Sequence, residues 1–221
     1  MSIITGMRLV SGLTAGSINA AELTGIISTP AGAAGWKAAI SSAALAQQLV
    51  QDPNARAAWM GSTAAVNAAV KLRSFVRIWL SHPEALDSLM SSASSVAALL
   101  DSREARIALW SHDQGLIAMG LSATAFAAAK ASNKLKQSGG IVTASPSIVI
   151  AGGGRFILVG TISNATVGMA TQSKRPGSAI PSVVPVAPVE RFAVFPLIGP
   201  FVCTTANSGG INVTVTYLPA D

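Results

Sequence analysis

The sequence repeats itself at an offset of 30 residues between residues 52 and 132. At this offset Ser81-His82 aligns with Ser111-His112, and Ala97-Ala98 aligns with Ala127-Ala128. One period earlier, six residues match their counterparts in the middle copy: Pro53, Ala55, Met60, Ser62, Val66 and Ala68. Three copies of one unit predict an array of similar elements, each stacked on its neighbours or on another chain.

The repeated unit has the spacing of a helix. In the middle copy, apolar residues recur every three or four positions and share one helical face, namely Leu86, Leu89, Ala93, Val96 and Leu100. Pro83 suits a first helical turn, and Ser92 borders the apolar stripe, where a small residue lets another helix approach. The pattern predicts helices at 30–50, 53–71, 73–81, 83–101, 103–110 and 113–136.

The apolar stripe is narrow and rich in alanine, so one such helix buries too little surface to offset the entropy of ordering it. We therefore expect the helices to pack on one another and between copies of the chain, as an oligomer. The side chains expected at these packing contacts are Trp59, Leu86, Leu89, Val96, Leu116, Met119 and Phe126.

The composition changes after residue 137. Short runs rich in β-branched residues follow, at 141–143, 148–150, 156–162, 191–195, 201–205 and 211–217, and the last of these alternates apolar and polar residues as a half-buried strand does. The segment 208–210 is a candidate hairpin turn, and the proline-rich segment 173–188, with Lys174 and Arg175, is expected to be a long contact loop. The predicted fold class is α+β: repeated Ala-rich helices, then a small antiparallel β-sandwich or barrel.

These boundaries predict three parts, which are an N-terminal arm at 1–29, a helical repeat region at 30–137 and a β-rich domain at 138–221. Within the arm, residues 3–10 are compatible with a short strand or an extended segment, and residues 17–27 have weak helical character.

Charge and hydropathy limit the classes of partner. Only 11% of the residues are charged, which suggests a surface that an assembly covers, and the net charge of +6 comes without a stripe of Lys and Arg. We therefore expect no specific nucleic acid partner. Mean hydropathy is +0.52, but alanine supplies much of it and charged or turn residues interrupt every long apolar run, so we expect no membrane span.

The motifs of enzymes and cofactor sites are not found in the sequence. Gly152-Gly153-Gly154 precedes an expected strand, where a phosphate-binding loop requires a helix. Cys203 is the single cysteine, and it has no neighbouring ligands for a metal. His82 and His112 share one repeat position at helix starts, which indicates caps or turn residues. We expect neither enzymatic activity nor a cofactor.

The repeats resemble the Ala/Ser/Met-rich helical segments of tailed-bacteriophage fibre and neck proteins. The resemblance lies in Trp59-Met60-Gly61-Ser62, Leu89-Met90-Ser91-Ser92 and Ala118-Met119-Gly120-Leu121-Ser122 with the Ala-rich residues that follow each. It implies a virion structural protein assembled in the host cytoplasm, homotrimeric, which contacts other virion proteins and a host surface glycan or receptor. Three alternatives are a capsid (head) decoration or head-fibre protein that stabilises the shell, a carbohydrate-binding module and a membrane-active protein.

Overall fold

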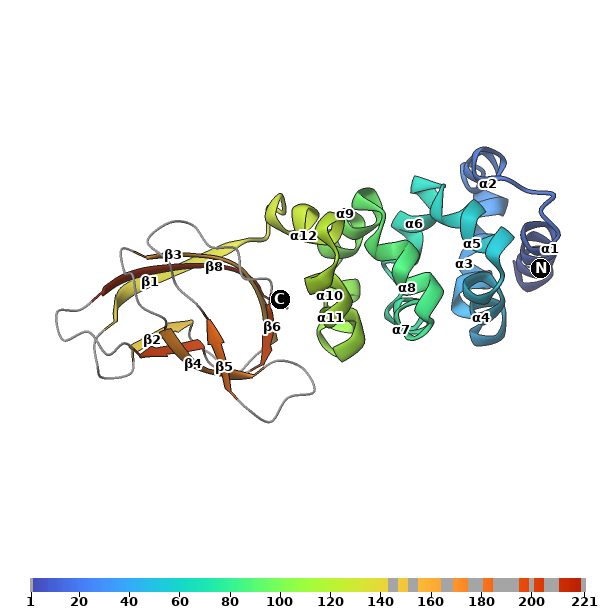
Figure 1. The fold of residues 1–221 in the computed structure, drawn as a ribbon. Helices are drawn as coiled ribbons and strands as arrows, with labels where there is room; N and C mark the ends of the chain where they lie inside the picture. The colour runs from blue at the N-terminus through green and yellow to red at the C-terminus, as the bar shows by residue number, and fades with distance from the viewer. Residues whose placement is uncertain are drawn as a thin grey trace. The chain divides into compact units, whose positions relative to one another are not determined.

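The computed structural model describes residues 2–142, 147–150, 155–163, 169–174, 181–184, 195–198, 201–204 and 211–219, with side chains at 3–137 and 217–219. The chain divides into two compact units, Met1–Ala118 and Met119–Asp221. The helices in the described residues are α1 Ser2–Thr14, α2 Ala20–Ile27, α3 Pro30–Ser41, α4 Ala43–Gln51, α5 Pro53–Met60, α6 Thr63–Ala69, α7 Arg73–Ser81, α8 Pro83–Met90, α9 Ala93–Asp101, α10 Arg103–Trp110, α11 Asp113–Leu121 and α12 Ala123–Lys130 (Figure 1).

The structural unit of the array is a helix of seven to nine residues that restarts every tenth residue. From α5 onward, each helix begins ten residues after the one before it. Helices this short are marginal in isolation because nucleation costs more than a few hydrogen bonds return. Their stability therefore comes from packing on neighbouring helices.

A polar residue caps most of these restarts. The residue before each helix adopts an extended backbone, which turns the chain, and its side-chain oxygen accepts a hydrogen bond from the backbone N–H three residues later. Asp52, Ser62, Ser92, Ser102 and Ser122 all act in this way. The ten-residue spacing of the helices therefore follows from the ten-residue spacing of the residues that cap them.

The long helices predicted from the sequence are wrong in their continuity. The predicted helix 30–50 breaks at Ser42, 53–71 at Ser62, 83–101 at Ser92 and 113–136 at Ser122. Ser92 does not border a helix seam; it is the N-cap of α9. We call the extended residue between two successive helices a corner. Ten residues make about 2.8 turns of α-helix, so apolar residues on either side of a corner still follow an approximate helical period.

Helices three apart in the sequence stack on one another. α4 contacts α7 and α7 contacts α10, while α3 contacts α6 and α6 contacts α9. The 30-residue repeat is therefore one turn of the array, made of three ten-residue units with one helix each, and Figure 1 shows these helices layered within residues 2–118.

Polar contacts connect successive turns. The Ser102 hydroxyl donates to the Val70 carbonyl at 2.6 Å, and Arg73 pairs with Glu104 at 2.7 Å. Arg56 pairs with Glu84 at 2.9 Å. The Val70 carbonyl is at the C-terminal end of α6, where helix carbonyls have no hydrogen-bond partner within the helix. The bond from Ser102 to this carbonyl therefore fixes the register between turns.

The core repeats with the same period. In the helices from α6 to α9, every residue whose number ends in 5, 6, 9 or 0 is buried, and those ending in 1 or 7 are exposed. The position ending in 5 is small in most units because it faces the preceding corner. Phe75 is the exception: it follows Leu72, a helix start without a side-chain cap, and its ring packs edge-on against Trp59 at 5.3 Å.

Residues 2–14 and 20–27 form two packed helices. The segment 3–10, for which the sequence suggested a strand or an extended arm, lies in α1, which contacts α3, α4 and α5. Helix α2 begins at Asn19, where a reciprocal capping box joins the Asn19 and Glu22 side chains to each other's backbone N–H groups.

The described strands belong to one sheet. They are β1 Lys136–Val142, β2 Ser147–Ile150, β3 Arg155–Ser163, β4 Met169–Lys174, β5 Pro181–Val184, β6 Phe195–Ile198, β7 Phe201–Thr204 and β8 Ile211–Pro219. The sheet order is β1-β8-β3-β6-β4-β7-β2, with β5 paired to β4. Every described strand pair is antiparallel.

The predicted fold class, α+β with an antiparallel β-sandwich or barrel, is wrong. The described part of the chain is mainly helical, and its strands follow a single pairing path without a second packed sheet or a pairing that closes a barrel. Alternation in the sequence indicates a strand, whereas strand order depends on contacts between distant segments.

Some predicted strands and turns also differ. The segment 173–188, predicted to be a loop, includes the end of β4 and all of β5, which starts at a proline where the lost N–H costs least. Strands β7 and β8, which flank the predicted turn at 208–210, pair with other strands. The turn itself, residue 143, residues 191–194 and residue 205 lie outside the described residues.

Replacing one corner serine tests the role of the caps. Ser102→Ala removes both the cap of α10 and the bond to Val70, so we expect the free energy of unfolding to fall by about 1–2 kcal/mol. Urea denaturation followed by circular dichroism measures it. The control is Ser111→Ala: this exposed serine bonds only within its own helix turn, and an equal loss there would contradict the prediction.

Candidate functional site

The residues predicted for packing contacts lie mostly in the interior of the single chain. Six of the seven are buried, with exposed fractions from 0% to 8%: Trp59, Leu86, Leu89, Val96, Leu116 and Met119. Phe126 is half-buried, and the Lys130 ammonium lies 5.7 Å from its ring centre. Their surroundings within the chain already remove most of this surface from water, so a partner chain is not needed to bury it.

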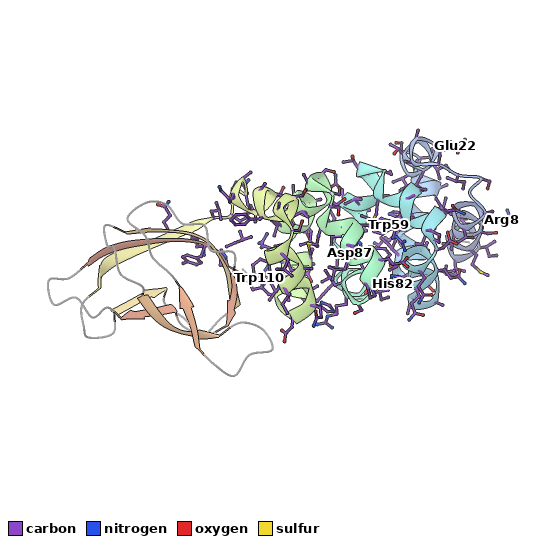
Figure 2. All side chains as sticks on the ribbon, in the orientation of Figure 1. Arg8, Glu22, Trp59, His82, Asp87 and Trp110 are labelled. Atoms are coloured by element: carbon purple, nitrogen blue, oxygen red, sulfur yellow. The ribbon has the colours of Figure 1, made fainter. Side chains whose placement is uncertain are left out.

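Trp59 is the centre of the largest aromatic cluster among the described residues. Its ring packs edge-on against Trp79 at 4.6 Å, and its indole N–H donates to the Leu49 carbonyl at 2.9 Å. The Trp36 and Trp79 indoles likewise donate to the carbonyls of Ala65 and Ala85. The tryptophans therefore join helices to helices, and Figure 2 shows Trp59 in the interior of the array.

The predicted contact residues at the sheet are only partly located. Lys174 is the last residue of β4, where its backbone pairs with Pro181 and Ile198. Arg175 lies outside the described residues. Their role in contacting a partner stays a prediction.

The two histidines occupy the same repeat position but bond differently. The His112 Nδ1 atom accepts a hydrogen bond from the Gly115 N–H at 3.0 Å, so His112 is the cap that the sequence predicted. His82 stands at the start of α8 without a side-chain cap bond, and its buried Nδ1 has no partner among the described residues.

The residue three positions later explains this difference. A Cβ atom at Gly115 would lie 3.2 Å from the His112 Nδ1 and 3.0 Å from a Leu109 methyl group. The glycine therefore leaves room for the imidazole to reach the N–H beneath it. The corresponding residue after His82 is Ala85, which carries that extra carbon atom.

The capping role requires a neutral imidazole at His112. Burial lowers the pKa of His112 below its usual 6.5, and the neighbouring carboxylate of Asp113 opposes this shift. A protonated Nδ1 cannot accept the Gly115 hydrogen bond. The cap therefore contributes stability above pH 6.5 and loses it as the pH falls through the lowered pKa.

Two open clefts lie on the helical array. One of about 310 Å³ lies between α4 and α7 and is lined by Gln47, Val50, Gln51, Arg77, Ile78, Ser81 and His82. The second, of about 650 Å³, lies between α1, α2 and α3 and is lined by Thr5, Ser17, Ile18, Glu22, Gly25, Ile26, Thr29 and Gly32. We refer to the second cleft as the N-terminal groove.

The N-terminal groove lies next to an exposed apolar face on α1. Ile3, Ile4 and Met7 are 48%, 56% and 56% exposed, while Leu9, Val10 and Leu13 on the other side of the helix are buried. The sequence did not indicate this site, because residues 3–10 did not show a clear helical pattern. Such a surface can bind apolar side chains of another chain.

The described residues hold no group of three or more His, Cys, Asp or Glu side chains arranged for a metal ion. In the same part of the chain, no helix combines the length and the hydropathy required to cross a membrane.

Neither the models of known protein families nor the curated proteins include one that matches this chain.

A pair of adjacent substitutions tests whether the packing residues stabilise the single chain. Val96→Asp places an unpaired charge at a fully buried position, so we expect it to destabilise the fold by several kcal/mol and to abolish the helical circular dichroism signal. Ala97→Asp places the same charge at an exposed position of the same helix and is the matched control. A helical monomer formed by Val96→Asp would show instead that Val96 acts between chains.

The His112 cap predicts a pH dependence of stability. As the pH falls from 7.5 to 5, we expect the wild-type chain to lose more unfolding free energy than His112→Asn, because asparagine accepts the capping bond at both pH values. Urea denaturation at each pH measures the difference. His82→Asn is the control, since His82 forms no cap bond, and it should keep the wild-type pH dependence; identical curves for His112→Asn and wild type would contradict the prediction.

Proposed function

We propose that this chain is a non-enzymatic structural protein of a bacteriophage particle, a tail or neck fibre component that attaches to the virion and spaces its outer parts. The observation that carries the proposal is the ten-residue helical unit, in which each further helix extends the array by a fixed increment. An array whose stability comes from its immediate neighbours suits a spacer, since its length changes without altering its core.

The chemistry of the surface supports the same role. Charged residues make up 11% of the chain, and alanine, serine and threonine take many of the exposed positions of the repeat. A weakly charged surface of this kind suits a protein that other proteins cover in an assembly.

The partners in this proposal are other copies of the chain, as a homotrimer, and other virion proteins. A host surface glycan or receptor is a further partner, contacted by the C-terminal strand-containing region, where Lys174 and Arg175 supply positive charge. The particle would acquire the protein during assembly in the host cytoplasm.

Mass spectrometry of purified particles tests this proposal. We expect the chain to be present in particles of the phage that encodes it, in a fixed ratio to the major capsid protein. Particles assembled without it should still contain DNA but should adsorb to cells more slowly or lose infectivity faster on storage. Absence of the chain from purified particles would overturn the proposal.

A further inference from the structure

We propose that the N-terminal end of the helical array is the self-association surface of this protein, where the exposed face of α1 in one copy packs into the N-terminal groove of a second copy. This inference rests on the self-association in the proposed function and names the surface that performs it.

The exposed face of α1 supplies the protruding half of the contact. Ile3, Ile4 and Met7 lie one helical turn or less apart and share a face. They are three of the four large hydrophobic side chains that are exposed among the described residues. A cluster of exposed apolar side chains on one helix face indicates a surface that another chain covers.

The N-terminal groove supplies the receiving half. Its walls come from Thr5 on α1, Ile18 before α2, Gly25 and Ile26 on α2, and Gly32 on α3. Its volume of about 650 Å³ is enough to hold several aliphatic side chains. The groove and the exposed face both involve α1, since Thr5 lines the groove and Ile4 belongs to the face.

Gly25 is the residue that most clearly indicates an external occupant. Gly6 and Gly35 permit the close approach of α1 and α3, since a Cβ at Gly35 would lie 2.7 Å from the Thr5 methyl group. A Cβ at Gly32 would collide with the Ile26 carbonyl. At Gly25 a Cβ would meet nothing within 4 Å, yet a glycine inside a helix costs about 1 kcal/mol relative to alanine.

No contact among the described residues accounts for that cost. A glycine in the wall of an open groove keeps the groove wide enough for side chains from outside. The packing of side chains from a second copy in the groove explains why a glycine occupies position 25.

Charge favours a second copy as the occupant. Arg8 follows the apolar residues on the exposed side of α1 and forms no ion pair among the described residues, while Glu22 lines the groove (Figure 2). Inserting the face of one copy into the groove of another brings Arg8 near a Glu22 of opposite charge. Direct pairing of two α1 helices would instead bring two Arg8 side chains together.

The geometry is compatible with more than a dimer. A protruding face and a groove are different surfaces, so their contact is heterologous and can close into a ring such as a trimer. Three apolar side chains make a contact at the small end of the range for specific interfaces, which begins near roughly 1,200 Å² in total. We therefore expect a dissociation constant in the micromolar range.

Sedimentation of the full chain across the micromolar range tests the proposal. We expect Gly25→Gln to raise the dissociation constant at least tenfold, because the new side chain fills the groove. The same change should leave the monomer as stable as the wild type or more so, since glutamine favours a helix and meets no clash. Met7→Ser should also weaken association, by removing part of the inserted face.

Two controls separate docking from folding. Ala97→Gln adds the same side chain at an exposed position of α9 and should not change association. Glu22→Gln removes the charge while keeping an acceptor for the capping box, so we expect weaker association with a smaller dependence on salt; Arg8→Gln should behave in the same way, and the double variant should be little worse than either single one.

The outcomes distinguish the two proposals. A wild-type chain that is monomeric throughout the micromolar range overturns both the self-association in the proposed function and this surface. Association that survives unchanged in Gly25→Gln and Met7→Ser overturns the surface alone. Neither result bears on whether the chain is present in purified particles.

Discussion

The hydrogen bond that a backbone N–H donates to the corner side chain three residues before it is the interaction on which the helical array depends. It satisfies one of the backbone N–H donors that every helix start leaves free. It also holds the corner residue in the extended conformation that turns the chain. Because the helices are short, these ends make up a large share of each unit. At Arg56 and Arg106 the guanidinium group serves the opposite end, by donating to the last carbonyls of the preceding helix.

The corners also determine which side chains the core accepts. The residue three positions after each corner donates the capping bond through its N–H. Its side chain faces the preceding corner, so a small residue is required wherever a polar cap is present. Leu72 and Phe75 show the alternative, in which an apolar residue replaces the cap and a large ring occupies the space next to Trp59 and Trp79. The two histidines show the same constraint in finer detail: His112 caps its helix over a glycine, and His82 stands over an alanine without a cap bond. One methyl group at this position separates the two arrangements.

The sequence predicted the helical region and its 30-residue period, because the period is carried by residue identities that align in three copies. It did not reveal the ten-residue unit, since serine, histidine, aspartate and leucine all occupy the corner and only their backbone conformation is shared. The burial of Leu89 and Val96 followed from helical spacing, but spacing cannot tell a contact within the chain from one between chains. The sheet order was out of reach, because β8 pairs with β1 and β3, strands that are distant in the sequence, and alternation within Ile211–Pro219 does not encode its neighbours. The groove was missed because Gly25 has the same local pattern as a glycine packed against its own chain.

In a repeat array, every unit makes the same contacts with its neighbours, except the units at the two ends. Interior helices contact helices a turn away on both sides: α4 contacts α1 and α7, α6 contacts α3 and α9, and α7 contacts α4 and α10. On α1 three large apolar side chains, Ile3, Ile4 and Met7, stay exposed. Here α1 and α2 fold over α3 with glycines at the close approaches of Gly6, Gly32 and Gly35, which brings three backbones together but leaves little side-chain volume to fill the space between them. The glycines at these positions therefore produce both the tight backbone contact and the shallow groove beside it. The face of α1 and the N-terminal groove therefore present apolar surface among the described helices, and interaction with another chain there does not disturb the repeated core.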